Sequence, residues 1–296
     1  MSFNKVVIVG VGLIGGSLGL ILKQKKLSGK VVGVGRRIEN LELAVKLGAI
    51  DHYESQALDA VTDADLVILA TPVDTYTAHL KEWGGCLPAR AIVSDVGSVK
   101  GHLVEEAEQL LPPHVRFVGA HPIAGKEKSG VAYATHDLFQ GARCLITPTK
   151  QTDPEALEKV CQLWQSVGSV VSQIDPLDHD FILGAVSHLP HVAAFALMQA
   201  LTELEGQLNN SSKLLEYSGG GLRDTTRVAA SSPEMWRDIC LENRDAILQA
   251  LAKYQSNLDG LKRMIADSKS NELFEAFAHA KSVRDANVMK HKTKQE

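Results

Sequence analysis

The feature that most constrains the fold is a β-branched run followed at once by closely spaced glycines. Val6–Val9 is a short apolar run that stops at Gly10, the pattern of a buried strand. The segment GVGLIG then matches the fingerprint G-x-G-x-x-G, and the apolar stretch after it predicts a helix from Leu13 to Lys25. A strand, a tight glycine turn and a helix in this order form a dinucleotide site, whose anion lies on the helix N-terminus. The predicted contact residues are Gly10, Gly12, Leu13, Ile14 and Gly15.

The same region contains an uncharged run, Val6–Leu22, that could be mistaken for a signal peptide or a membrane span. It is interrupted by glycines and has no small-x-small cleavage site before a polar start. A spanning helix needs about 20 apolar residues, which this run does not supply. We therefore expect a soluble, cytoplasmic protein that does not enter a membrane.

The first half of the chain alternates between strand-like and helical segments, which predicts βαβ units and a parallel sheet. The predicted strands after the first are Val31–Val34, Leu66–Ala70, Ala91–Ser94, Arg116–Gly119, Cys144–Thr147 and Val170–Ile174. From Pro176 onward the pattern is helical, with segments at about 177–205, 222–230, 233–266 and 270–288. The prediction is an α/β Rossmann-type doubly wound domain over 1–175, followed by an all-α substrate and dimerisation domain over 176–296.

One helical segment of the second half is apolar on almost every side. Val192–Leu201 has Gln199 as its one polar member, so the helix must be surrounded. A helical domain of this size offers few such places, and a subunit interface would supply the cover. We expect a homodimer.

Charge and cysteine content exclude several functions. The formal net charge is -4, with Lys and Arg numbering 31 against 35 Asp and Glu, which argues against a nucleic-acid partner. The four cysteines stand far apart without paired spacing, so we expect no metal site and no disulfide framework.

The end of the second strand bears on the choice of cofactor. An NAD site normally has an acidic residue there for the ribose 2′-OH, whereas this chain has Arg36 and Arg37 and no acid before Glu39. Two guanidiniums suit a 2′-phosphate, so NADP is predicted rather than NAD. The alternative is a solvated pair of loop charges. Thr71 and Pro72, which end the strand Leu66–Ala70, are placed in the same cofactor site.

Four further motifs contain the residues that are candidates for catalysis and substrate binding. They are SDVGSVKG from Ser94, GAHPIAGKEKSG from Gly119, the DHD and SHLPH segments between Asp178 and His191, and GGGLRDTTR from Gly219 with PEMWRD after it. In this order the set resembles the prephenate and arogenate (cyclohexadienyl) dehydrogenases over nearly the whole chain. The resemblance implies transfer of a hydride from a cyclohexadienyl ring carbon to the nicotinamide, with loss of the ring carboxylate as CO2.

The resemblance also implies site residues. His121 matches the catalytic histidine, Ser98 the serine that contacts it and the ring hydroxyl, Arg227 a carboxylate-binding arginine, and His191 a substrate contact. An imidazole with a pKa near neutrality independently suits the task of taking the hydroxyl proton.

Four more residues complete the predicted substrate site: His188, Asp180, Lys126 and Glu127. The alternative for Lys126 and Glu127 is that they merely cap the next turn. Asp180 is expected to pair with Arg227, either to orient its guanidinium or as a structural ion pair. Pro190 cannot donate a hydrogen bond to Val186, so the helix should kink or open beside His188 and His191.

Two other functions remain open at this stage. A related NADP-dependent hydroxyacid or imine reductase commonly has a lysine acid on the first long helix of the second domain, and Leu177–Glu205 has none. A dinucleotide-sensing protein without turnover would not need the set of His121, Ser98 and Arg227. The residues that distinguish a keto acid from an amino acid substrate are not fixed by any motif.

Overall fold

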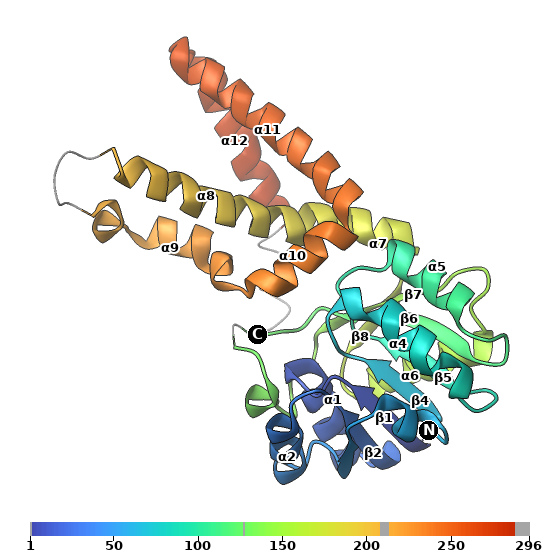
Figure 1. The fold of residues 1–296 in the computed structure, drawn as a ribbon. Helices are drawn as coiled ribbons and strands as arrows, with labels where there is room; N and C mark the ends of the chain where they lie inside the picture. The colour runs from blue at the N-terminus through green and yellow to red at the C-terminus, as the bar shows by residue number, and fades with distance from the viewer. Residues whose placement is uncertain (1, 127, 208–212, 288–296) are drawn as a thin grey trace. The chain divides into compact units, whose positions relative to one another are not determined.

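The computed structural model describes residues 2–126, 128–207 and 213–287, and its first half is built around one eight-stranded sheet (Figure 1). The order of the strands is β3-β2-β1-β4-β5-β6-β7-β8. Their bounds are β1 Phe3–Val9, β2 Ser28–Val34, β3 His52–Glu54, β4 Leu66–Leu69, β5 Ile92–Asp95, β6 Arg116–Pro122, β7 Arg143–Thr147 and β8 Val170–Gln173. The chain reverses its direction of travel along the sheet between β1 and β4, which is where doubly wound sheets bind ligands.

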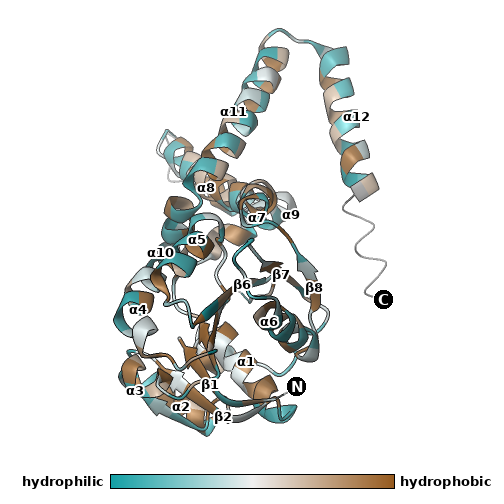
Figure 2. Ribbon diagram, turned by 90° about the vertical axis from the view of Figure 1, so that its right-hand side faces the viewer, coloured by the Kyte–Doolittle hydropathy of each residue, from teal (hydrophilic) through white to brown (hydrophobic). Residues whose placement is uncertain are grey.

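Helices cover both faces of this sheet. One apolar layer contains side chains of α1, α2 and α6, and the opposite layer contains side chains of α3, α4 and α5. The bounds are α1 Leu13–Gln24, α2 Ile38–Lys46, α3 Ala57–Val61, α4 Tyr76–Trp83, α5 Gly101–Leu110 and α6 Pro154–Ser166. The central strands lie between the layers and are hydrophobic, as Figure 2 shows. The uncharged run Val6–Leu22 is divided between β1 and α1, two buried elements of this core.

The sheet departs from the predicted all-parallel arrangement at one place. β7 runs antiparallel to β6, and β8 is parallel to β7. A parallel return needs a crossover connection, usually a helix. The connection 123–142 has, among its described residues, only the single 3₁₀ turn Val131–Tyr133, so the chain comes back in the opposite direction.

The second half of the chain is helical, as predicted. Its helices are α7 Pro176–Leu183, α8 Leu189–Glu205, α9 Gly220–Thr226, α10 Pro233–Glu242, α11 Arg244–Ala266 and α12 Ser270–Asn287. The predicted helix over 233–266 is divided at Asn243, which lies between α10 and α11. Asp175 begins α7 as an N-cap, because its side chain accepts the backbone N–H groups of Leu177 and Asp178.

By compactness the chain divides into two units, Met1–Ile247 and Leu248–Glu296. The first unit therefore includes α7 to α10 together with the sheet, although the change from strands to helices lies near residue 175, where the domain boundary is predicted. The second unit contains most of α11 and all described residues of α12, with large exposed apolar side chains such as Phe274 and Phe277.

One helical run, Pro176–Glu205, is long and apolar enough to cross a membrane by length and composition, and 22% of its most apolar window is buried. In α8 only Ala194 is fully buried within the chain. An uncovered apolar helix is also what a subunit interface leaves exposed in a single chain.

Candidate active site

The glycine turn after β1 forms a cradle of backbone. Gly10 has φ +101°, and a Cβ atom there would lie 2.5 Å from the carbonyl oxygen of Ala70, so only glycine fits. A Cβ atom on Gly12 would meet nothing within 4 Å, which leaves space for a ligand against the backbone. No side chain caps the start of α1, so the N–H groups of its first turn, which includes Leu13, Ile14 and Gly15, are available to an anion. This geometry fits a dinucleotide pyrophosphate.

Arg36 and Arg37 follow β2 and are exposed beside this cradle. Arg37 is the residue before α2, and Asn40 in the first turn of α2 donates a hydrogen bond to the carbonyl of Val11, 2.8 Å away. This bond fixes the loop of the two arginines to the glycine turn. The pKa of His79 on α4 lies below its usual value, chiefly because the imidazole is partly buried. The positive charge of Arg36 lowers this pKa as well.

Thr71 and Pro72 lie on the other side of the glycine turn, after β4. The hydroxyls of Thr71 and Thr75 are hydrogen-bonded at 2.7 Å, and Pro72 precedes the 3₁₀ turn Val73–Thr75. The residue before Thr71 is Ala70, whose carbonyl leaves no room for a Cβ atom on Gly10. The predicted cofactor residues are therefore gathered at the carboxyl edge of β1, β2 and β4.

The loop that carries Ser98 is held by a fully buried ion pair. Lys100 Nζ lies 2.5 Å from Asp95 Oδ2, and it also donates to the carbonyls of Gly97 and Val99 at 2.7 and 3.0 Å. Asp95 Oδ1 accepts the N–H of Ala120 at 2.9 Å. The pair thus joins the loop after β5 to the residue immediately before His121, and Ser98 is half-buried within it.

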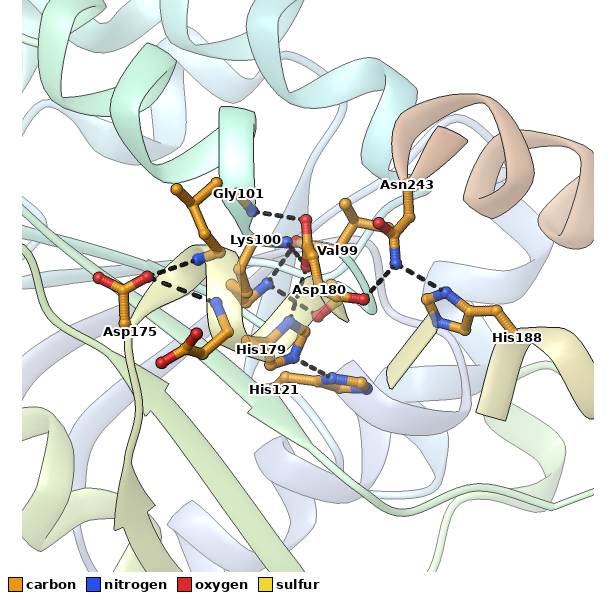
Figure 3. A network of polar contacts seen from close by, with 12 residues as sticks. Val99, Lys100, Gly101, His121, Asp175, His179, Asp180, His188 and Asn243 are labelled. Carbon is orange, nitrogen blue, oxygen red and sulfur yellow. Dashed lines mark hydrogen bonds and ion pairs between the residues drawn. The ribbon is translucent and has the colours of Figure 1, made fainter. Parts of the chain in front are cut away.

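His121 lies inside β6, one residue before its end, and is 9% exposed. Its Nδ1 is 2.9 Å from Nε2 of His179, and Nδ1 of His179 is 2.7 Å from Oδ1 of Asp180 (Figure 3). Nδ1 of His121 is thus bonded to another histidine. Burial, followed by the electrostatic influence of His179, Lys100 and His188, holds the pKa of His121 well below its usual value. The imidazole is therefore neutral near pH 7 and able to accept a proton.

The helix opens where Pro190 predicts it. Gly184–His188 forms a π-helical turn between α7 and α8, and the N–H of Leu189 bonds to the carbonyl of Gly184 five residues back. The carbonyl of Ser187 accepts a hydrogen bond from Nδ1 of His191 at 2.9 Å. Single π turns inside helices are frequent at functional sites, and this one directs two histidines.

His188 is buried at this turn. Asn243, between α10 and α11, donates to Nδ1 of His188 at 3.0 Å and to the carbonyl of Asp180 at 2.8 Å. Burial lowers the pKa of His188 to about 4, so it is a neutral hydrogen-bonding group.

His191 is half-buried and stacks on Trp236, with ring centroids 3.8 Å apart. Trp236 is a core residue, and it packs with Val99 of the Ser98 loop. The short 3₁₀ helix Arg227–Ala230 packs against α8, and the charge of Arg227 contributes, after burial, to lowering the pKa of His191. The structure thus connects the Ser98 loop, His191 and the neighbourhood of Arg227.

One predicted contact of the substrate site differs from the structure, that of Asp180. Asp180 was expected to pair with Arg227, but its carboxylate instead accepts the N–H groups of Lys100 and Gly101 at 2.8 and 2.7 Å, besides bonding to His179. It faces the start of α5 because unpaired backbone donors there have no cap of their own. Lys126 is exposed and donates to the hydroxyl of Thr135 at 3.2 Å. Glu127 lies outside the described residues.

Sequence reasoning missed three residues of this cluster: His179, Asn243 and Lys100. The signal for His179 was present in the DHD segment, since a histidine beside an acid at the start of a helix can bond to it. Nothing local marks Asn243, which reaches the site through the fold. Among residues 2–126, 128–207 and 213–287, no group of three or more His, Cys, Asp or Glu is arranged to hold a metal ion.

A nucleotide-binding sheet with a buried neutral histidine at its carboxyl edge defines an oxidoreductase of the NAD(P)-dependent class. The profile described as "Prephenate dehydrogenase, nucleotide-binding domain" matches residues 18–173, and "Prephenate dehydrogenase, dimerization domain" matches residues 175–279. The chain belongs to the prephenate dehydrogenase family.

Individual proteins agree with this assignment. Prephenate dehydrogenase of Bacillus subtilis is 35% identical over 98% of this chain and 77% of its own length. The crystal structure of prephenate dehydrogenase from A. aeolicus, in complex with hydroxyphenyl propionate and NAD+, has a TM-score of 0.90 at 40% identity and covers 97% of this chain and 99% of its own. Synechocystis arogenate dehydrogenase has a TM-score of 0.80 at 32% identity, with coverages of 95% and 99%.

Proposed function

We propose that the protein oxidises and decarboxylates a cyclohexadienyl acid, prephenate or arogenate, in the biosynthesis of tyrosine. The product is 4-hydroxyphenylpyruvate from the first substrate and tyrosine from the second. The observation that carries the proposal is His121, a buried neutral imidazole held in a strand at the same sheet edge as the dinucleotide cradle.

Different residues of the site have different roles in this reaction. When bound, the nicotinamide supplies the acceptor for the hydride that leaves the ring carbon bearing the hydroxyl. His121 takes the hydroxyl proton as that carbon becomes a carbonyl, and Ser98 holds the substrate hydroxyl. Formation of the aromatic ring makes loss of the carboxylate as CO2 strongly favourable. Arg227, from the side of α8, binds a carboxylate of the substrate, and His191 forms the adjoining wall on Trp236.

We propose NADP as the preferred dinucleotide. The support is the pair Arg36 and Arg37, fixed beside the glycine turn through Asn40 with no acidic side chain between them and β2. The NAD+ bound in the A. aeolicus structure is the contrary indication, and comparing the affinities for the two dinucleotides decides the matter.

We further propose that the functional form is a homodimer, built on the apolar side chains that α8 leaves uncovered in one chain. The description of the matched profile as a dimerization domain supports this assembly. A cytoplasmic location, without nucleic-acid or membrane partners, also remains a prediction.

Appearance of the reduced nicotinamide band tests the activity. Purified protein is mixed with NADP or NAD and with prephenate, arogenate or simple hydroxyacids in separate reactions. We expect turnover with at least one cyclohexadienyl acid. Turnover with hydroxyacids alone would identify a reductase of the related class, and dinucleotide binding without any turnover would identify a sensing protein.

A further inference from the structure

Two side chains behind His121 have no role in the proposed chemistry. His179 is fully buried and Asp180 is 7% exposed, and both lie in the second turn of α7. The two imidazole rings of His121 and His179 meet edge-on, with centroids 5.1 Å apart. Together with Asp180 they form a line of two hydrogen bonds that ends at a carboxylate (Figure 3).

The direction of these hydrogen bonds follows from what each group can donate. An ionised carboxylate only accepts, so Nδ1 of His179, 2.7 Å from Asp180 Oδ1, must carry a hydrogen. In a neutral His179 the other nitrogen, Nε2, is then an acceptor. It lies 2.9 Å from Nδ1 of His121, which must therefore donate. A neutral His121 with its hydrogen on Nδ1 has a bare lone pair on Nε2, the form that a base requires.

These directions hold for a charged Asp180 and a neutral His179. Asp180 accepts the first N–H groups of α5, where the helix dipole favours a negative charge. For His179, burial is the main influence, and the net effect of burial with Asp180, Asp95 and Lys100 lowers the pKa of the ring. His188, on the π turn, also faces His121 and is neutral, and the nearby thiol of Cys144 is neutral because burial raises its pKa.

We propose that His179 and Asp180 are positioning residues that fix the tautomer of His121, so that its Nε2 is bare and faces the substrate. The proposal deepens the proposed function, since it rests on His121 acting as the base. When His121 takes the proton on Nε2, the N–H on Nδ1 stays directed at His179, and the new positive charge is stabilised through His179 by the carboxylate.

Gly101 provides independent support. A Cβ atom at Gly101 would lie 2.8 Å from Asp180 Oδ2, so even alanine would displace the carboxylate. Gly101 is the first residue of α5. Gly101→Ala is thus a remote change that should disturb the line without touching either histidine.

The first experiment measures the tautomer of His121 in the substrate-free protein from the ¹⁵N shifts of labelled imidazoles. We expect the hydrogen on Nδ1 in the wild type. His179→Leu removes the acceptor and should let the Nε2–H form appear, whereas His179→Gln offers an amide oxygen to Nδ1–H and should restore the wild-type form. His102→Leu, an exposed histidine on α5, is the matched control and should change nothing.

The second experiment follows kinetics in the same variants. We expect kcat of His179→Leu to fall by up to about 10²–10⁴-fold, the contribution of a correctly positioned general base, with KM and dinucleotide affinity near wild type. His179→Gln should recover most of kcat, and Gly101→Ala should lower kcat without lowering the melting temperature.

The outcomes separate the alternatives. An Nε2–H tautomer in the wild type overturns the inference, and so does a His179→Leu variant with normal kcat, or one whose loss appears only in KM and melting temperature. If the wild type shows the expected tautomer, lost in His179→Leu, but turns over neither prephenate nor arogenate, the proposed function fails while the assignment of His179 and Asp180 stands.

Discussion

Lys100 Nζ lies 2.5 Å from Asp95 Oδ2, and neither side chain is exposed to solvent. The pair holds the Ser98 loop against β6, because Asp95 also accepts the N–H of Ala120. Removal of one charge leaves the other buried without compensation. Lys100→Met should therefore lower the free energy of unfolding by about 3–5 kcal/mol, measured by urea denaturation.

The double variant Asp95→Asn/Lys100→Met is the control for that prediction. It removes both charges of the pair, so it should recover a large part of the stability lost in the single variant. A single variant within about 1 kcal/mol of wild type, the range of exposed ion pairs, would show that the pair is not what holds the loop.

His121→Asn tests the base. Asparagine keeps some hydrogen bonding but cannot take the proton, so kcat should fall by about 10²–10⁴-fold. Binding of dinucleotide and substrate, measured by calorimetry, should survive. A variant within a few-fold of wild type would remove His121 from the mechanism.

The pH profile of kcat belongs to the same test. Burial holds the pKa of His121 well below its ordinary value of 6.5, so the neutral base persists into mildly acidic solution. We expect kcat to stay level from about pH 8 down to about pH 6 and to fall only below the ordinary range of histidine. The residual kcat of His121→Asn should not show this fall at low pH.

Arg36→Ala tests the cofactor preference. Loss of a charge-assisted contact costs about 1.5–3 kcal/mol, so the dissociation constant for NADP should rise tenfold or more while that for NAD hardly changes. Lys46→Ala, an exposed cation at the end of α2, is the matched control. Tighter binding of NAD than of NADP by the wild type would contradict the preference.

Arg227→Ala tests the substrate contact. We expect KM for the cyclohexadienyl acid to rise by about 10²-fold, or about 2.7 kcal/mol, with the NADP constant near wild type. Arg227→Lys keeps the charge but loses the planar fork, so it should be impaired as well. Arg223→Ala, which removes an exposed arginine of α9, serves as control. A lowered melting temperature with a normal KM would make Arg227 structural.

Sedimentation velocity tests the assembly. At micromolar concentration we expect a particle of twice the 32.0 kDa chain mass. Leu197→Glu, in the apolar stretch of α8, should shift it toward the monomer because a charge would be buried at the interface. Leu58→Glu on α3 places the same charge on an exposed apolar residue and should leave the mass unchanged. A stable wild-type monomer would rule out the dimer.

The sequence predicted the elements whose signals are local. The β-branched run before Gly10 and the glycine turn after it specify β1 and α1, and Pro190 specifies the opened turn after Gly184. The direction of β7 was missed because strand patterns carry no orientation, although the lack of a helix between His121 and Cys144 could have indicated it. The expected pairing of Asp180 with Arg227 differs from the structure for another reason: besides its neighbour His179, Asp180 bonds to backbone N–H groups, which leave no mark in side-chain identity.

His121 belongs to β6, a strand that pairs with β5 on one edge and with β7 on the other, and not to the loop that follows. Sequence changes in the connection 123–142 should therefore leave the backbone position of His121 unchanged. We expect natural variation in that connection to leave the place of the imidazole, and with it the proposed catalytic step, as it is.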